Sequence, residues 1–252
     1  MKIDRMSGQN AGVAERRVMV IIPAFNEEAA LGSLIPKARA RCPRCDLVVV
    51  DDGSTDDTLK IAYAAKVIVL RHPVNLGYGA SLQTGIEYAL RRGYSTVAFL
   101  DADGKHEPED LEKLLAPVVS GQCDVAIGSR FLDPGSYRHG VFRKFGSWAF
   151  SRLVRLLTSI PVTDPTSGAR ALNRRAMRLY TREGFPDEFP DVSAIVLYHR
   201  YGLRVCEVPV RMYPSVKKRP MHRGMTVPYY IFNVFFSILI ALLQEGTPAK
   251  EE

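Results

Sequence analysis

The apolar run Ser95-Thr-Val-Ala-Phe-Leu100 is followed at once by Asp101-Ala102-Asp103-Gly104. A continuous apolar and β-branched run of this length is typical of a strand that is buried on both faces of a sheet. Aspartates cannot lie inside such a strand, so Asp101 and Asp103 mark the point where the chain leaves it. In an open α/β sheet, this carboxyl end of the strands is where ligands bind.

The two carboxylates at this strand end repel each other, and the repulsion needs a compensating charge. A divalent cation that carries a phosphorylated ligand supplies it, because Mg²⁺ is usually held by one or two carboxylates together with substrate phosphates. Asp101 and Asp103 are therefore candidate metal ligands. The alternative is an acidic loop in which an aspartate caps a helix.

Four more apolar runs with strand character alternate with helical patterns around this stretch. They are residues 18–22, 46–50, 66–70 and 124–127. The alternation predicts an α/β fold with a mostly parallel, doubly wound, Rossmann-like sheet. Three of the five strands end in carboxylates or in a turn that bears them, and Arg130 follows a fourth. Charged groups therefore gather at one edge of the predicted sheet.

The later part of the chain has a different pattern. A strand is predicted at residues 203–210, after helical stretches at 146–157 and 174–180. The loop at residues 75–80 is rich in glycine, and Gly79 permits close approach of the backbone to a ligand. This loop lacks the third glycine of a dinucleotide fingerprint, which argues against a nicotinamide cofactor.

The length of 252 residues is sufficient for one large domain. We expect a loose tail over residues 1–16, a single domain over 17–226, an apolar helix over 227–244 and a short tail over 245–252. The net charge of +7 suits an anionic partner, either nucleic acid, a phosphorylated ligand or an acidic membrane. Nucleic acid is the weakest of these, because no basic stripe with interleaved aromatic residues is apparent. The other interpretation is a generally basic surface.

The four cysteines stand at positions 42, 45, 123 and 206. Cys42 and Cys45 have redox spacing, but they precede a predicted strand instead of opening a helix after one. We therefore expect free thiols in a reducing cytoplasm.

The C-terminal segment Tyr229–Leu243 is apolar almost all round. It is shorter than the roughly 17–25 residues that span a bilayer. The basic run at residues 217–223 just before it could hold anionic headgroups. We predict an interfacial anchor for peripheral contact with a membrane. The alternative is packing against the same domain or against a symmetric partner, which leaves a homodimer open.

Seven motifs, taken in order, resemble those of the family 2 glycosyltransferases, and within them the branch of dolichyl-phosphate and polyprenyl-phosphate sugar synthases. The motifs lie at residues 22–27, 50–56, 75–80, 101–104, 128–130, 164–170 and 207–210. The resemblance implies a single nucleotide-sugar-binding domain of the GT-A fold and an inverting transfer from a nucleotide-diphosphate sugar. The motifs are much less specific for the sugar and for the acceptor.

The same resemblance implies roles for individual residues by their place in these motifs. The residues implied to bind the nucleotide sugar are Pro23, Ala24, Asn26, Glu27, Asp52, Gly79, Asp101, Ala102 and Asp103. Asp101 and Asp103 would hold Mg²⁺ or Mn²⁺. The candidates for binding phosphates are Arg130, Arg143, Arg170 and Arg223, because the planar guanidinium makes bidentate contacts with phosphate. Asp103, through the metal, and Arg130 would stabilise the leaving diphosphate, which makes them catalytic candidates.

One residue departs from the pattern of this branch. The residue two positions after the second aspartate is commonly Gln or His and can join the metal shell, whereas here it is Lys105. A protonated ammonium group cannot ligate a metal. Water could fill that position, His106 could substitute, or Lys105 could neutralise the diphosphate. The departure also keeps open a catalytically degenerate subunit that binds nucleotide sugars.

The resemblance implies a UDP-sugar or GDP-sugar as donor and polyprenyl phosphate as acceptor, at the cytoplasmic face of the membrane. A saccharide hydroxyl is the alternative acceptor. A hydroxyl needs a general base, for which Asp191 is the candidate, although an aspartate after Pro190 can equally cap a helix. A lipid phosphate is already largely ionised near neutral pH and needs little base catalysis.

Overall fold

The structure is a computed structural model that describes residues 17–103, 108–132, 141–186, 192–211 and 236–243. The predicted tails, residues 1–16 and 245–252, lie outside the described residues. The same holds for most of the predicted C-terminal helix before residue 236.

Seven strands form one sheet in the order β3-β2-β1-β4-β6-β5-β7. Their bounds are β1 (Val18–Ala24), β2 (Cys45–Asp51), β3 (Ile68–Arg71), β4 (Thr96–Phe99), β5 (Val125–Ser129), β6 (Arg170–Asn173) and β7 (Val205–Pro209). Neighbouring strands pair in parallel, except that β6 is antiparallel to both β4 and β5. The predicted α/β fold with a mostly parallel sheet is confirmed.

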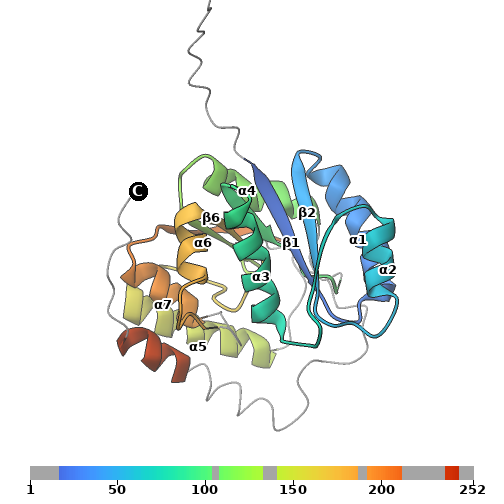
Figure 1. Ribbon diagram of the computed structural model, residues 1–252. Helices are drawn as coiled ribbons and strands as arrows, with labels where there is room; N and C mark the ends of the chain where they lie inside the picture. Colours follow the sequence, from blue (N-terminus) through green and yellow to red (C-terminus); the bar gives the residue numbers. More distant parts are fainter. Residues whose placement is uncertain (1–16, 104–107, 133–140, 187–191, 212–235, 244–252) are drawn as a thin grey trace, which may run out of the picture.

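Helices cover both faces of this sheet, as expected for a doubly wound fold (Figure 1). The helices are α1 (Glu28–Arg41), α2 (Thr58–Ala64), α3 (Tyr78–Arg91), α4 (Leu111–Val119), α5 (Val141–Thr158), α6 (Arg174–Tyr180) and α7 (Val192–Arg200), with a 3-10 turn η1 (Pro108–Asp110) before α4. Helices α1, α2 and α4 pack on one hydrophobic core, and α3, α5, α6 and α7 pack on the other.

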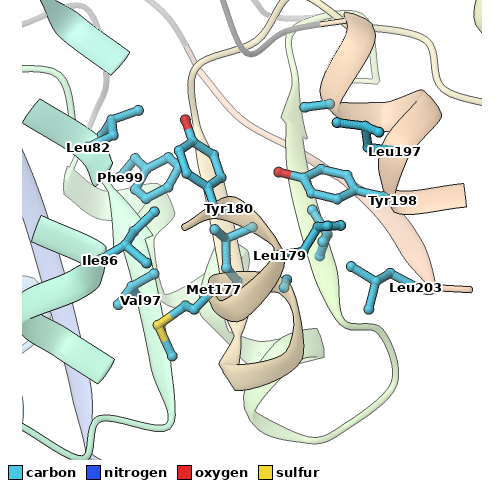
Figure 2. Close-up of a cluster of buried hydrophobic side chains, with 14 of the residues drawn as sticks. Leu82, Ile86, Val97, Phe99, Met177, Leu179, Tyr180, Leu197, Tyr198 and Leu203 are labelled. Carbon is cyan, nitrogen blue, oxygen red and sulfur yellow. The ribbon is translucent and has the colours of Figure 1, made fainter. Parts of the chain in front are cut away.

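The strands supply both cores by simple alternation of side chains. In β1, Met19 and Ile21 belong to the core under α3, whereas Val20 and Ile22 belong to the core under α1. Figure 2 shows the first of these cores, where side chains of α3, α6 and α7 meet those of β4. Phe99 packs edge-on against Tyr180 there, with 5.8 Å between the ring centroids. The continuous apolar runs of the sequence are therefore strands that are buried on both faces.

Strand β6 is a feature that the sequence pattern does not predict. It has only four residues, too few to establish a periodicity. Because it runs antiparallel between β4 and β5, its first residue, Arg170, pairs with Ile127 in β5, and the preceding Ala169 accepts a hydrogen bond from the amide of Gly128. The loop before β6 therefore lies at the same edge at which the parallel strands end.

The expectation of free thiols is wrong for this structure. Cys42 is bonded to Cys45, and Cys123 is bonded to Cys206. The Cα atoms of the two pairs are 5.3 and 6.0 Å apart, within the range that a disulfide allows. Cys123 stands just before β5 and Cys206 lies in the neighbouring β7, so the second pair depends on a strand pairing that the linear sequence does not reveal.

Residues 236–243 form a helix near the C-terminal end of the chain, drawn in red below α7 in Figure 1. Its buried side chains, Ile238 and Ala241, belong to the same core as α3, α6 and α7. One face of this helix therefore packs against its own domain, which is the first of the two alternatives to a membrane anchor given for this segment. Within the described residues, no helix has both the length and the apolar character needed to cross a bilayer.

Gly85 lies where α3 packs against β1, and it provides a test of the packing. A Cβ atom at Gly85 would lie 2.6 Å from Cγ2 of Ile21, a fully buried β-branched residue in β1. We expect Gly85→Ala to lower the free energy of unfolding by about 1–3 kcal/mol, because the interior cannot absorb the added methyl group.

The matched control for this prediction is Gly32→Ala, in the interior of α1. The nearest atom to a Cβ there is Cγ2 of Ile61 at 3.8 Å, an ordinary contact. This change should raise the free energy of unfolding by about 0.5–1 kcal/mol, because alanine favours the helix. Urea unfolding followed by circular dichroism measures both. Equal effects of the two substitutions would show that α3 does not pack as described.

Candidate active site

The polar side chains singled out in the sequence gather at the carboxyl edge of the sheet. The loops after β1, β2, β3, β4 and β5 meet there, together with the loop that precedes β6. Hydrogen bonds join the loops after β1, β2, β3 and β4 to one another, and they join the end of β5 to the loop before β6. This edge is the place where an open α/β sheet binds its ligands.

The first link joins the loop after β1 to the loop after β2. Pro23 and Ala24 are the last residues of β1, and both are buried. The side-chain oxygen of Asn26 accepts a hydrogen bond of 2.9 Å from the amide of Thr55, and the amide of Asn26 donates to Oγ of Ser54 at 3.0 Å. Asn26 does not cap α1, because the capping position is Glu27.

Asn26 adopts a left-handed backbone conformation, with φ of 53°. Asparagine tolerates this conformation better than most residues, which accounts for its presence at a sharp turn out of β1. The turn places the amide of Glu27 2.7 Å from Oγ1 of Thr58, which accepts its hydrogen bond. The tips of β1 and β2 are thus held together by polar contacts.

The acidic pair follows β4. Asp101 and Asp103 are partly exposed, whereas Ala102 between them is buried. The hydroxyl of Tyr78, the first residue of α3, donates to Oδ1 of Asp101 at 2.9 Å. Lys105 and His106 lie outside the described residues. Within the residues that the structure does describe, no group of three or more His, Cys, Asp and Glu side chains is placed to hold a metal ion.

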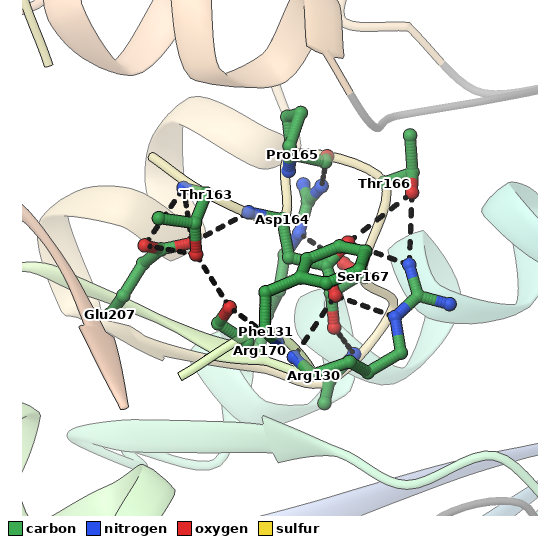
Figure 3. Close-up of polar contacts among 11 residues, drawn as sticks. Arg130, Phe131, Thr163, Asp164, Pro165, Thr166, Ser167, Arg170 and Glu207 are labelled. Carbon is green, nitrogen blue, oxygen red and sulfur yellow. Dashed lines mark hydrogen bonds and ion pairs between the residues drawn. The ribbon is translucent and has the colours of Figure 1, made fainter. Parts of the chain in front are cut away.

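Arg130, at the end of β5, makes a bidentate ion pair with Asp164 in the loop before β6 (Figure 3). Nε and Nη2 lie 2.5 and 2.6 Å from the two carboxylate oxygens, and Nη2 also donates to Oγ1 of Thr166 at 3.0 Å. Asp164 is fully buried and the Arg130 side chain is 12% exposed. The guanidinium that was expected to face phosphate is therefore already shared with a carboxylate of its own chain.

The family model of glycosyl transferase family 2 matches residues 19–180. This range includes the ends of β1, β2, β3 and β4 together with Arg130 and Asp164. The chain belongs to this family.

Individual relatives agree with that assignment. The chain is 37% identical over 169 residues to polyprenol monophosphomannose synthase of Mycolicibacterium smegmatis, a match that covers 64% of this chain and 63% of that protein. It is 27% identical over 247 residues to UDP-N-acetylglucosamine–dolichyl-phosphate N-acetylglucosaminyltransferase of Methanococcus voltae, covering 90% of this chain and 97% of that one.

A solved structure shows the same fold. Glucosyl-3-phosphoglycerate synthase from Mycobacterium tuberculosis, crystallised with Mn²⁺ and UDP-glucose, is similar with a TM-score of 0.69 over 94% of this chain and 82% of that one. The sequence identity is 24%, so this similarity concerns the fold. It agrees with the GT-A architecture that the motifs imply.

In this family 2 glycosyltransferase the side chain of Arg170 is buried, whereas its motif implies contact with a phosphate. It is 2% exposed, and it donates to the carbonyl oxygens of Ser167 at 3.1 Å and Pro165 at 3.3 Å. Burial raises the pKa of the Tyr198 hydroxyl, and the positive charge of Arg170 acts in the opposite direction. Arg170 therefore braces the loop before β6 from inside the protein, and this position does not suit direct contact with a phosphate.

Glu207 in β7 supports the same loop of this glycosyltransferase from the other side (Figure 3). Its carboxylate accepts hydrogen bonds from the amides of Thr163 and Asp164 at 2.8 and 2.9 Å. Burial raises the pKa of Glu207, and the donors from the loop act in the opposite direction. The loop that carries Asp164 is thus held by Arg130, Arg170 and Glu207 together.

Two further candidates for binding the nucleotide sugar, Gly79 and Asp52, are buried at this edge. Gly79 is buried in the first turn of α3, and Asp52 is buried beside the loop after β3. The side chain of Arg143 and all of Asp191 and Arg223 lie outside the described residues.

Sequence reasoning missed four residues of this edge, namely Tyr78, Asp164, Glu207 and His72, whose Nδ1 lies 2.7 Å from Oδ1 of Asp52. Three of them stand in the quoted motifs, at residues 75–80, 164–170 and 207–210. Their place in those motifs was the available signal. Their partners became visible only with the fold, because each partner comes from a different strand end.

Proposed function

We propose that this glycosyltransferase moves a sugar from a nucleoside diphosphate to polyprenyl phosphate at a membrane surface, with inversion at the anomeric carbon. The observation that carries the proposal is the acidic pair after β4, set among the joined loops of β1, β2 and β3 in a family 2 chain. Relatives named for polyprenol and dolichyl phosphate acceptors support the lipid phosphate.

The donor set fits a divalent cation that arrives with the diphosphate. Asp101 and Asp103 supply hard oxygen ligands, which Mg²⁺ and Mn²⁺ prefer. Two carboxylates do not complete a coordination shell, so diphosphate oxygens and water would supply the rest. When bound, the cation neutralises the charge that develops on the leaving diphosphate. The crystallised neighbour contains Mn²⁺ with UDP-glucose, which agrees with this donor chemistry.

The chain's own residues bind and orient the two substrates. A polyprenyl phosphate is already ionised near neutral pH, so its attack on the anomeric carbon requires alignment and little proton transfer. With this acceptor, Asp191 would be less important as a general base than it would be with a saccharide hydroxyl. The paired Arg130 and Asp164 keep the loop before β6 in a fixed position beside the acidic pair, where Gly168 closely approaches Asp101.

A second group of observations supports the membrane location. The sequences of α5, α7 and residues 236–243 contain no Asp or Glu, whereas α5 and α7 together carry four arginines and a lysine. Helix α5 and the helix of residues 236–243 lie toward the lower end of Figure 1, where β1 ends. Several large apolar side chains on these two helices are exposed, namely Trp148, Leu156, Phe236, Leu239, Ile240, Leu242 and Leu243.

This apolar and basic surface suits a bilayer that contains anionic lipids. Leu156 is 82% exposed and Leu243 is 75% exposed, so neither is covered by its own domain. Arg152, one turn before Leu156, and Arg155, directly before it, lie on the same helix α5. Buried apolar area and basic residues near anionic headgroups both favour interfacial binding. We propose that this surface holds the enzyme as a peripheral protein on the cytoplasmic face of the membrane.

The test of the donor site is a thermal shift screen of the full chain, with and without Mn²⁺. UDP-, GDP- and dTDP-sugars are compared with the bare nucleoside diphosphates. We expect stabilisation by one nucleotide class only, and only with Mn²⁺. A ligand at a hundredfold excess over its Kd stabilises the native state by about 2.7 kcal/mol.

Radiolabelled transfer from the selected donor to polyprenyl phosphate then tests the acceptor, with saccharides as the comparison. Transfer to saccharides alone would replace the lipid phosphate by a hydroxyl acceptor. The absence of any thermal shift in a folded sample would contradict the proposed donor site and support the degenerate binding subunit.

A further inference from the structure

Asp52 was expected to face the nucleotide, but its carboxylate is occupied within the protein. The residue is 3% exposed. Its Oδ1 accepts from Nδ1 of His72 at 2.7 Å and from the amide of Leu76 at 2.9 Å. Its Oδ2 accepts from the amide of Gly77 at 2.9 Å. Through these three hydrogen bonds, the carboxylate holds the imidazole of His72 and the amides of Leu76 and Gly77 in place.

His72 connects this carboxylate to α3. It is 6% exposed and follows β3 directly. Its Nε2 lies 2.9 Å from Oγ1 of Thr84. Because an ionised Asp52 can only accept, Nδ1 carries the proton and Nε2 accepts from the threonine hydroxyl in the neutral ring. His72 is therefore bonded on both sides, to the tip of β2 and to the second turn of α3.

The loop that Asp52 holds, residues 74–77, has little apolar anchoring of its own. Val74 and Leu76 are both more than half exposed. Gly77 has a positive φ of 101°, which favours glycine. On the other side the loop touches Gly53, where a Cβ atom would lie 2.7 Å from the carbonyl carbon of Val74. The hydrogen bonds to Asp52 are thus the main attachment of this loop.

The loop leads directly to the acidic pair. Tyr78 follows Gly77, and its hydroxyl donates to Oδ1 of Asp101 at 2.9 Å. A Cβ atom at Gly168 would lie 3.2 Å from that hydroxyl and 3.5 Å from Oδ2 of Asp101, so the loop before β6 closes over the contact. The position of the loop therefore sets where Tyr78 meets the Asp101 carboxylate.

We infer that Asp52 and His72 form a positioning pair for the donor site. They fix the loop of residues 74–77 and, through Tyr78, orient the Asp101 carboxylate toward the metal and the diphosphate. The part of this inference that concerns Asp101 rests on the proposed function. Both side chains are buried and hydrogen-bonded within the protein, so in this inference they act through other residues.

Two uncharged substitutions of His72 separate its two contacts. His72→Asn keeps a donor near the position of Nδ1, within reach of Asp52, but loses Thr84. His72→Gln places its amide near the position of Nε2 and leaves Asp52 without that donor. Both remove one imidazole from the same site, so they form a matched pair with different predictions.

The first readout is residue-resolved hydrogen exchange of the full chain without ligand. We expect His72→Gln to speed exchange of the Leu76 and Gly77 amides about tenfold or more, while His72→Asn stays within about threefold of wild type. The second readout is the affinity for Mn²⁺ with UDP, or with GDP if the donor screen selects it. This affinity should fall about tenfold in His72→Gln and recover in His72→Asn.

Tyr78→Phe tests the last step of the chain. It should weaken Mn²⁺–nucleotide binding in the same direction as His72→Gln, while exchange at Leu76 and Gly77 stays at the wild-type rate. Unchanged exchange at these two amides in His72→Gln would overturn the inference. So would faster exchange over the whole chain with unchanged affinity, because that indicates a purely structural histidine. If the wild-type chain binds no nucleotide, the proposed function fails, yet hydrogen exchange still decides whether the pair holds the loop.

Discussion

Asp103→Asn is expected to lower the rate of sugar transfer by about 10²- to 10³-fold, the size of effect seen when a single stabilising group is removed from a developing anion. The asparagine keeps the shape of the side chain and one carbonyl oxygen. It removes one of the two negative charges that hold the divalent cation against the diphosphate. The measurement is the initial rate of transfer over a series of Mn²⁺ concentrations.

The dependence on Mn²⁺ identifies the cause of the loss. If Asp103 holds the cation, the variant needs more Mn²⁺ for half-maximal rate, and excess Mn²⁺ restores part of the activity. The matched control is Asp57→Asn, which removes the same charge from an exposed carboxylate 2.6 Å from Nζ of Lys60. It should leave both quantities near wild type. A wild-type rate and Mn²⁺ dependence in Asp103→Asn would falsify the metal role of this residue.

The position of these carboxylates could be predicted from the sequence because it depends on local pattern. An apolar run followed by Asp101-Ala102-Asp103 can only be a buried strand and its exit, and parallel strands all end at one edge. The same reasoning found the tips of β1, β2 and β5. It needed no knowledge of which strands are neighbours.

The roles of the arginines could not be predicted in this way, because they depend on sheet order. Arg130 and Arg170 look alike in their motifs, yet Arg130 follows β5 and Arg170 begins β6, an antiparallel strand with a neighbour on each side. The interior position of β6 buries Arg170 and brings Asp164 to Arg130. The disulfide between Cys123 and Cys206 escaped prediction for the same reason.

Asp52 shows a further limit of motif reasoning. An aspartate at a strand end suits a ligand pocket, and its motif implies one. Whether its oxygens are available depends on His72, 20 residues further along and on the next strand end. Burial and hydrogen-bond partners are properties of the fold, so the same residue type at the same edge can bind a ligand or hold a loop.

The second large effect is expected at the exposed apolar surface. Leu239 and Leu243 lie one turn apart in the helix of residues 236–243, and they are 52% and 75% exposed. Each leucine that leaves water favours binding by about 1.5–3 kcal/mol. Replacing both with glutamate should therefore weaken binding to vesicles of phosphatidylcholine and phosphatidylglycerol by about a hundredfold or more. Co-sedimentation with the vesicles measures the loss.

The control carries the same change of charge elsewhere on the surface. Tyr63→Glu with Ala64→Glu replaces two exposed residues of α2, on the other face of the sheet, and should leave vesicle binding unchanged. The Leu239→Glu, Leu243→Glu variant should lose transfer to long polyprenyl phosphate in vesicles. It should keep transfer to a short, water-soluble polyprenyl phosphate, because the donor site is intact.

The comparison of these two acceptors distinguishes membrane contact from the other uses of an apolar surface. If the variant loses both activities, the helix supports the catalytic domain itself, since Ile238 and Ala241 belong to its core. If it keeps vesicle binding but changes from dimer to monomer in sedimentation velocity, the surface joins two copies of the chain. Only selective loss with the membrane-borne acceptor fits a surface that brings the carboxyl edge of the sheet to the bilayer, where a lipid phosphate can reach the donor sugar.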